Sequence, residues 1–490
     1  MFRDSLLRLP LSVILVCAGL AAVPMPCLSQ NPVTYMLLEG SSLVEDCTIC
    51  GRPPLIMPMR GTFQLVFREE NPLFTFYDVR NVSFEAGTGG LIYMVAGEGA
   101  YQIGGEVAVV HEMQLKVQVN DLPDIELQSG SWSITERRWP VIEIDIAEEP
   151  IDPLRVYSMH LIAAPVREIW FSTSTDFTSW TLGETVSAGD LLSHTGRVVR
   201  KNSHLVGKLG IMPIVPDLGL DALDIAAGGE CLFSLELEEG IFSETLGNLH
   251  NGDLLSDKGR IVKRNQELTS AFGGMPPVPD VGLDAVHIMP DGEILFSIEQ
   301  ELFSENLGVM LYPGDLLSDK GVVVRSNKEL VAKFEPVEGG KDVGLDAIYV
   351  WPSGEIWFST ESSFQSKRLG VIGYGDLLSD SGWVIFRNLE LLQQFAPLED
   401  LADFGLDSLF FVTDNHTKEV TTSKPTITVD PEFGDVWLRW ESKGRVFQVE
   451  RADDPRGPFV PLNAISPGTD YCDPAAALGK TKSFYRLREW

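Results

Sequence analysis

The sequence predicts an all-β protein built around a β-propeller-like array of four repeats of about 62 residues. Two observations lead to this class. A stretch of the type GDLLSDKGRIVKRN begins at Gly189, Gly252, Gly314 and Gly375, so its copies lie 61 to 63 residues apart. Short β-branched and aromatic runs, punctuated by Gly, Asn and Asp, fill most of the remaining chain, which is typical of strands rather than of long helices.

Each repeat contains two β-hairpins. The first joins a GLDAVHI-type strand, which begins at Gly219, Gly282, Gly344 and Gly405, to an EILFSI-type strand, which begins at Glu168, Glu230, Glu293 and Glu355. The GDLLS and RIVKRN strands form the second hairpin. A short helix such as NQELTSAF follows, with Asn265 expected as its cap. One such unit cannot bury both faces of its sheet, so the repeats must pack against each other.

The order of strands favours a closed ring over an open row of units. The array, residues 152–414, begins with a degenerate first strand at Val156–Ala163 and ends with a surplus first strand, GLDSLFF. A surplus strand at the end can complete a split first blade, which predicts four or five blades. The DAVHIMPDGEILFS hairpin followed by GDLLS resembles strand pairs of uncharacterised bacterial secreted repeat proteins of β-propeller type. That resemblance implies a fold and no activity.

Two smaller β domains are expected on either side of the array. Runs such as TFQLVF, MQLKVQV and VIEIDI within residues 31–150 predict a β-sandwich or a barrel. Residues 415–425 are a polar linker, and residues 426–490 hold VFQVERADDPRGPF and SFYRLREW. These two motifs resemble the small fibronectin type III-like modules that end many exported bacterial proteins. The resemblance implies a small β-sandwich that serves as a spacer or in surface attachment.

The first 29 residues are typical of a signal peptide. Arg3 and Arg8 precede the apolar stretch Leu11–Val23, and small residues lead to a cleavage position after Ser29. We therefore expect a secreted, periplasmic or cell-surface protein; an uncleaved anchor is the alternative. No later stretch predicts a transmembrane segment. The net charge of −32 argues against nucleic acid and anionic membranes as partners.

Two cysteines form a C-T-I-C motif at Cys47 and Cys50. In an exported chain this spacing predicts a local disulfide. A zinc site would need two further ligands, and a redox pair would need a βαβ context that the flanking sequence lacks. Cys231 lies in an apolar strand and is expected to be buried.

The pattern D-x-G-x-D recurs in every repeat, and its second residue enters the innermost strand. These residues are Asp221, Asp284, Asp346 and Asp407. Carboxylates that meet near an axis can share a calcium ion, which takes six to eight oxygen ligands, so calcium is the one cofactor that the sequence suggests. We favour the competing interpretation, in which the Asp residues of this pattern, including the first ones at Asp217, Asp280, Asp342 and Asp403, accept backbone N–H bonds, because contacts that define a fold must recur in every repeat.

Signatures of known catalytic sites are missing, including G-x-S-x-G, H-E-x-x-H and phosphate-binding loops. His287, alone in a strand, is more typical of a core residue than of a base. The fourth repeat is richest in aromatic residues, and Trp351 and Trp383 are the candidates for stacking on a ligand. Trp170 matches Trp357 in register and is expected in the core.

These observations favour an exported, non-enzymatic binding or scaffold protein with a surface polysaccharide or protein as partner. The alternative is a propeller-type hydrolase or lyase acting on extracellular carbohydrate or a lactone, with or without calcium. Symmetry separates the two hypotheses. A catalytic site requires polar residues that differ between repeats to meet at one end of the axis, whereas a scaffold needs only the repeated ones.

Overall fold

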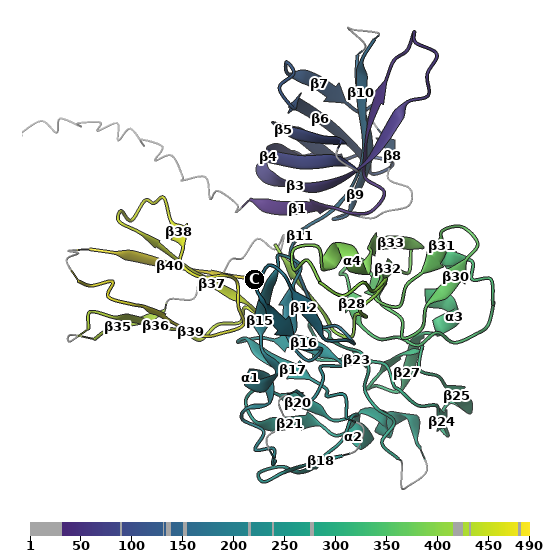
Figure 1. The fold of residues 1–490 in the computed structure, drawn as a ribbon, viewed down its shortest axis with the longest axis vertical. Coiled ribbons are helices and arrows are strands. Elements are labelled where there is room, and N and C mark those ends of the chain that lie inside the picture. Colours follow the sequence, from purple (N-terminus) through teal and green to yellow (C-terminus); the bar gives the residue numbers. More distant parts are fainter. Residues whose placement is uncertain are drawn as a thin grey trace, which may run out of the picture.

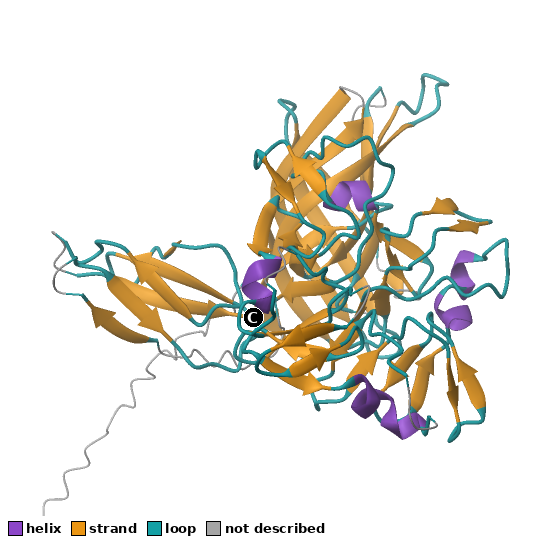
Figure 2. Cartoon of the chain, turned by 60° about the horizontal axis from the view of Figure 1, so that its bottom comes forward, coloured by secondary structure: helices purple, strands orange, loops and turns teal. Residues whose placement is uncertain are grey.

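The computed structural model describes residues 32–88, 91–130, 132–133, 139–149, 154–213, 217–237, 240–274, 279–414, 425–430, 433–478 and 482–490. The expected signal peptide and residues 415–424 of the expected linker lie outside this set. The described chain forms an N-terminal domain, a central ring of sheets and a C-terminal module (Figure 1). Strands dominate all three parts and helices are short (Figure 2), which confirms the all-β class.

Among the helices of the described residues, none is both long and apolar enough to span a membrane.

The N-terminal domain is one ten-stranded sheet that closes on itself. Its closing pair joins β9 to β10, with Ile146 opposite Met159. Alternate residues point inward, as in β6, so the buried faces meet in one core that includes Tyr35, Phe63 and Tyr101. Of the two predicted alternatives, the barrel is therefore the one observed. The strands are β1 (Val33–Leu37), β2 (Ser42–Asp46), β3 (Leu55–Glu70), β4 (Phe74–Thr88), β5 (Leu91–Gly104), β6 (Val110–Val119), β7 (Ile125–Gln128), β8 (Trp132–Ser133), β9 (Ile142–Glu148) and β10 (Val156–Ala164).

One boundary differs from the sequence prediction. Residues Val156–Ala163, expected to start the repeat array, lie in β10 and pair with β1, β2 and β9 of the N-terminal domain. The segment lacks the Gly-Leu-Asp start of the true first strands, and nine residues make it long enough to span the barrel. The array therefore begins at β11 (Val166–Phe171) and not at residue 152.

The central part contains four four-stranded sheets, each of which runs outward from an innermost strand. Sheet 1 contains, in this outward order, β34 (Leu409–Thr413), β11, β14 (Leu191–Ser193) and β15 (Arg197–Arg200). Sheet 2 contains β16 (Leu223–Ala226), β17 (Glu230–Phe233), β20 (Leu254–Ser256) and β21 (Arg260–Lys263). Sheet 3 contains β22 (Val286–Ile288), β23 (Ile294–Phe296), β26 (Leu316–Ser318) and β27 (Val322–Arg325). Sheet 4 contains β28 (Ile348–Val350), β29 (Ile356–Phe358), β32 (Leu377–Ser379) and β33 (Trp383–Phe386).

Short hairpins and helices connect these strands. Each hairpin lies in the loop between the second and third strands: β12 (Phe177–Ser179) with β13 (Glu184–Val186), β18 (Ile241–Ser243) with β19 (Gly247–Leu249), β24 (Leu302–Ser304) with β25 (Val309–Leu311), and β30 (Phe364–Ser366) with β31 (Gly370–Ile372). Each helix follows an outermost strand: α1 (Asn202–Val206), α2 (Asn265–Thr269) with η1 (Ser270–Phe272), α3 (Asn327–Leu330) with η2 (Ala332–Phe334), and α4 (Asn388–Leu391).

The four sheets form a closed, propeller-like ring. The innermost strands touch in a circle, β16 to β22, β22 to β28, β28 to β34 and β34 to β16. A circle of hydrogen bonds runs alongside, in which a serine hydroxyl of each second strand donates to a backbone carbonyl of the next sheet. The pairs are Ser172 with Leu220, Ser234 with Leu283, Ser297 with Leu345 and Ser359 with Leu406. The surplus strand β34 completes sheet 1 by pairing with β11.

The recurring Asn residue has a different role from the predicted one. Arg264 occupies the N-cap of α2, and Asn265 is the first helical residue. The buried Asn265 amide accepts a bond from the Val281 backbone N–H and donates one to the Gly282 carbonyl, at 3.2 and 3.1 Å. It therefore fixes the link to the next sheet, which explains why every repeat keeps it.

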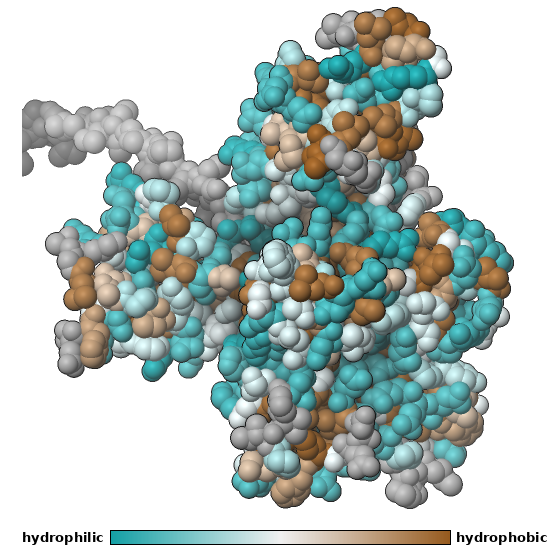
Figure 3. Space-filling model, in the orientation of Figure 1, coloured by the Kyte–Doolittle hydropathy of each residue, from teal (hydrophilic) through white to brown (hydrophobic). Residues whose placement is uncertain are grey.

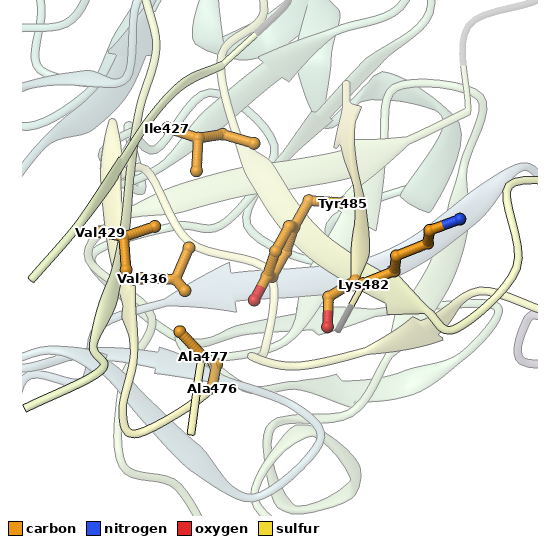
Figure 4. A pocket seen from close by; sticks show the side chains of 8 residues that line it. Ile427, Val429, Val436, Ala476, Ala477, Lys482 and Tyr485 are labelled. Atoms are coloured by element: carbon orange, nitrogen blue, oxygen red, sulfur yellow. The ribbon is translucent and has the colours of Figure 1, made fainter. Parts of the chain in front are cut away.

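The C-terminal module is a small β-sandwich, as expected. One sheet contains β35 (Thr426–Val429), β36 (Val436–Arg439) and β39 (Asp470–Asp473); the other contains β38 (Val460–Pro461), β37 (Phe447–Ala452) and β40 (Phe484–Glu489). Leu438, Phe447 and Leu487 lie in the core between them. Near one edge the sheets leave a mainly apolar hollow lined by Ile427, Val436 and Tyr485 among others (Figure 4).

Candidate functional site

One end of the ring axis carries a dense group of carboxyl groups, which we call the acidic end. Four of them, Asp221, Asp284, Asp346 and Asp407, precede the innermost strands. Three more follow the second strands of sheets 2, 3 and 4, at Glu236, Glu299 and Glu361. Sheet 1 has Ser174 at the corresponding position, and its hydroxyl donates a hydrogen bond to Asp407. The repeat symmetry of the acidic end is therefore broken at one position.

The acidic end has a buried floor and an open rim. Asp284 is 4% exposed, and Asp346 and Asp407 are also buried, whereas Glu236 and Glu361 are exposed. One carboxylate oxygen from each of Asp221, Asp284 and Glu299 lies within 4.8 Å of the others. This group therefore combines two Asp residues that precede innermost strands with Glu299, and Asp221 and Glu299 are half-buried.

Glycine residues allow the rim to approach the floor so closely. A Cβ atom on Gly282 would lie 2.2 Å from Glu299 Cδ, and Gly219, Gly344 and Gly405 face Glu236, Glu361 and Ser174 in the same way. All four glycines have φ between 70 and 80°, a left-handed conformation that side chains disfavour. The Gly-Leu-Asp motif of every repeat is thus a requirement of the acidic end.

Burial, and after it the repulsion between these groups, raises their pKa values. Burial, followed by the charge of Glu299 and of other carboxyl groups, raises the pKa of Asp221 well above its usual range. Burial and neighbouring carboxyl groups do the same to the pKa of Asp284 and of Asp346. Burial raises the pKa of Asp407 to about 7, although the Ser174 hydroxyl opposes the shift. Without a counter-charge, the floor therefore holds protons at a pH where ordinary carboxyl groups are ionised.

Backbone hydrogen bonds go to the first Asp of each D-x-G-x-D pair. Asp280, for example, accepts bonds from the backbone N–H groups of Gly252 and Gly282, at 2.9 and 3.0 Å. Asp217, Asp342 and Asp403 accept equivalent bonds in the other repeats. Within the described chain, no backbone N–H donates to the side chains of Asp221, Asp284, Asp346 or Asp407. The backbone role that we favoured for the Asp residues of this pattern therefore holds for the first of each pair and not for the second.

A second group with metal-ligand chemistry, His250, Asp253 and Asp280, lies at the outer part of sheet 2. Its carboxylates already accept hydrogen bonds from protein groups. Asp253 accepts bonds from Arg264 at 2.6 Å and from the His250 backbone N–H at 3.1 Å. The Asp residues of the GDLLS motifs all accept such bonds, so their role is to hold the turn before the third strand.

The other end of the axis carries residues that differ from sheet to sheet, and we call it the capped end. Three positions after the axial Asp, the four innermost strands present Asp224, His287, Tyr349 and Phe410. Asp224 Oδ2 lies 3.6 Å from His287 Nδ1, and the rings of His287 and Tyr349 are 5.0 Å apart. All four side chains are buried, and burial lowers the pKa of His287.

Arg445 of the C-terminal module covers the capped end. Its guanidinium group pairs with Asp224, donates to the Ile225 carbonyl and lies over the Phe410 ring. Asp224 also accepts a 2.7 Å bond from the backbone N–H of Ile288 in the next sheet. The polar residues that differ between repeats do therefore meet at one end, but the neighbouring module occupies their open side.

The aromatic candidates are placed differently. Trp351 is 4% exposed and its ring packs against Trp357 and Phe411, at 4.9 and 6.0 Å, so it offers no face to a ligand. Trp383 is half-buried, and Arg368 lies over its ring. Trp170 is fully buried, as its match to Trp357 predicted.

The cysteines follow the sequence prediction. Cys47 and Cys50 form a disulfide. Cys231 is buried, and burial raises the pKa of its thiol to about 12, so it is chemically inert at neutral pH.

Comparison with known proteins supplies no family. No protein-family model matches the chain, and no curated protein matches it. Among solved structures, the extracellular domain of a hybrid two component system from B. thetaiotaomicron aligns over 84% of this chain and 70% of its own length, with 10% identity and a TM-score of 0.12. At that TM-score the likeness supports neither a fold nor an activity.

Sequence reasoning missed two sets of residues that the repeat alignment contains. The rim residues are the last residues of a recurring segment that reads FSLE, FSIE and FSTE in three repeats. The first repeat reads FSTS, which places Ser174 where the others have Glu. The third residue after the axial Asp is the one position of the first strand that changes between charged, polar and aromatic types. Because this position faces the ring axis, a change of residue type there between repeats indicates a candidate functional site.

Proposed function

We propose that this protein is an exported, non-enzymatic scaffold that holds its two flanking domains in fixed positions and binds a surface polysaccharide or protein. One observation carries the proposal: contacts between domains, which we call joints, cover the polar residues that distinguish the repeats at the capped end, and these described residues are all buried. Arg445 against Asp224 is the first of these joints.

Asp414 is the second joint, and it contacts all three parts of the chain. It accepts hydrogen bonds from Arg167 of the ring at 2.6 Å, from the backbone N–H of Thr34 in the N-terminal domain at 2.8 Å, and from the Trp490 indole of the C-terminal module at 2.7 Å. Its side chain is 10% exposed. A buried carboxylate with three donors fixes the geometry of its neighbours, as a rigid scaffold requires.

Apolar packing continues across both domain boundaries. Met36 and Ile162 of the N-terminal domain belong to the same core cluster as Trp357 and Phe411 of the ring. Val446 and Ile465 of the C-terminal module belong to a cluster with Phe233 and other ring residues. Domains that share a core move together, whereas domains joined by a polar linker alone do not.

The exposed apolar residues and the net charge of the chain indicate which class of partner it binds. Apolar side chains gather at the tip of the N-terminal domain farthest from the ring (Figure 3). Exposed apolar residues of this domain include Ile56, Leu91, Ile92 and Met94. A net charge of −32 disfavours anionic polymers, so a neutral polysaccharide or a protein is the partner that the surface favours.

The test measures binding and turnover on the same samples. Residues 30–490 are incubated with insoluble neutral polysaccharides (cellulose, chitin and β-1,3-glucan) and with purified surface proteins of the organism that produces the protein. Bound protein is measured by sedimentation, and new reducing ends and lactone opening are measured in the supernatant. We expect saturable retention by one of these partners and no turnover.

The hydrolase or lyase hypothesis makes the opposite prediction. Turnover that disappears in His287→Ala and increases in Arg445→Ala would place a catalytic site at the capped end and overturn the scaffold proposal. Neither retention nor turnover on any partner would also contradict it. A matched control is His204→Ala, which changes an exposed histidine of the same ring.

A further inference from the structure

We propose that the acidic end binds one calcium ion, with Asp221, Asp284 and Glu299 as its protein ligands. The site does not depend on the proposed scaffold role. It is formed by residues of two neighbouring sheets, since Asp221 precedes β16 while Asp284 and Glu299 flank β22 and β23.

The distances between the carboxylates fit one shared ion. Oxygens that bind the same calcium at roughly 2.4 Å lie at most about 4.8 Å apart. The three carboxylates each place one oxygen within 4.8 Å of the others. In the described chain, no Arg or Lys side chain forms a salt bridge with any of these three residues. Their charges are therefore not neutralised by a basic side chain.

A buried carboxylate oxygen without a hydrogen bond also supports a bound cation at this place. Asp284 is 4% exposed, and its Oδ2 atom has no hydrogen-bond partner within the described structure. The carboxyl group of Glu361 lies close enough to share a proton with Asp284, but that contact brings together two groups of the same charge. Leaving a carboxylate oxygen buried and unpaired is costly, and a cation at this point removes the cost.

Calcium fits the site better than smaller or softer cations. All the candidate ligands are carboxylate oxygens, which excludes a preference for zinc or copper. Calcium accepts six to eight oxygens in irregular geometry, with water completing the shell, whereas magnesium demands a near-ideal octahedron. Glu236 and Glu361 of the rim are exposed, so this side of the acidic end faces water.

The experiment titrates calcium chloride into residues 30–490 by calorimetry, after exhaustive treatment with chelator. We expect one ion per chain. A thermal melt should show the ring transition rise by about 5 °C or more when calcium is in large excess over its dissociation constant. Magnesium chloride is expected to bind more weakly at the same site.

Two variants locate the ion. Asp284→Asn and Glu299→Gln should each weaken calcium binding by about tenfold or more. Asp291→Asn, in the exposed turn between β22 and β23 of the same sheet, should bind as the unmodified chain does. In chelator, Asp284→Asn should melt no lower than the unmodified chain, because it removes one of several repelling carboxylates; this keeps lost binding distinct from lost folding.

Several outcomes overturn the proposal. Absence of heat together with identical melts in calcium and chelator would leave the acidic end as a group of carboxyl groups that share protons. Full binding in both variants would place the ion elsewhere. Equal affinity for magnesium would refute the choice of calcium, and a lower melt of Asp284→Asn in chelator would show that its carboxyl group is a structural hydrogen-bonding group.

Discussion

The two ends of the ring axis are built from the same four strands, but one end carries the same residue in every repeat and the other carries a different residue in each. At the acidic end the four Asp residues are identical in every repeat, and their charges repel one another. At the capped end, three positions further along each strand, all four residues differ and their contacts attract. Repetition therefore gathers like charges at one end, and variation forms the joint with the neighbouring module at the other.

This comparison of the two ends indicates which positions of a repeated fold can form a functional site. A residue kept in every repeat is usually structural, and the first Asp of each pair and the Asn of each helix follow that rule. The second Asp does not, because four copies of one charge meet on an axis. Each copy is ordinary alone, and only the closed ring makes the set a site.

The largest expected effect comes from removing the packing that supports Tyr349 at the capped end. Phe411→Ala removes a buried ring that packs against Tyr349 at 4.7 Å and Trp357 at 5.1 Å. Loss of this packing should lower the free energy of unfolding by about 3–5 kcal/mol, measured by urea denaturation. Phe433→Ala is the control, because Phe433 is 61% exposed. Equal loss in both variants would mean that the capped end is not specially packed.

Asp224→Asn tests the joint itself. It weakens the pair with Arg445 while leaving one oxygen for the backbone, so we expect a loss of about 2 kcal/mol. Limited proteolysis should release the C-terminal module earlier. In a double-mutant cycle with Arg445→Ala the two effects should not add. Additive effects would mean that the residues act independently.

The same chemical change at the acidic end should have the opposite sign. Asp346→Asn removes a buried carboxylate among like charges, and should raise stability by about 1 kcal/mol in chelator at pH 8. The unmodified chain in chelator should also lose stability as pH rises. Its folded state holds extra protons between the usual Asp pKa of 3.8 and about 7, the pKa of Asp407. Melts of both chains from pH 5 to 8 test this, and a lower melt for the variant would contradict it.

The smallest effect concerns a residue of sheet 1 that breaks the repeat pattern. His194 Nδ1 accepts a 3.1 Å bond from the Ile169 backbone N–H, whereas Asp257, Asp319 and Asp380 accept this bond in the other sheets. An acceptor nitrogen carries no proton, and burial lowers the pKa of His194 to about 4. The stability it contributes is present above its usual pKa of 6.5 and is lost as pH falls toward 4.

His194→Asp should restore the pattern of the other sheets and reduce this sensitivity to acid. Because His194 is half-buried, we expect a gain of about 1 kcal/mol at pH 5, relative to pH 8, measured by thermal melts. His204→Asn, at an exposed histidine, should show no such gain. A variant as acid-sensitive as the unmodified chain would show that another group controls the transition.

Much of the fold could be predicted from the sequence because the repeats act as an internal alignment. The spacing of GDLLS and GLDA indicated the strand pairs, and the surplus GLDSLFF strand indicated closure. The boundary at β10 was missed because an apolar strand looks the same whichever sheet it joins. Pairing between distant strands depends on tertiary contacts that local pattern does not contain.

The candidate site was harder to predict. The axial Asp residues were identified, but their partners Glu236, Glu299 and Glu361 lie in a different strand, and only folding brings them together. Trp351 and Trp383 were selected for being aromatic and distinctive, and that property also suits a core. Arg445 could not be assigned to the capped end, because its contact with Asp224 spans 221 residues of sequence.

Completion of sheet 1 by β34 has a consequence for how the chain assembles. Sheets 2, 3 and 4 are local and can form while the chain is still emerging, but β11 waits for a partner 236 residues away, as the Ser172–Ser408 contact shows. Such non-local pairing is slow. Until it occurs, sheet 1 has an unpaired edge open to other chains, and Asp407 has not joined the floor. The last strand of the ring to form therefore both closes the ring and assembles its acidic end.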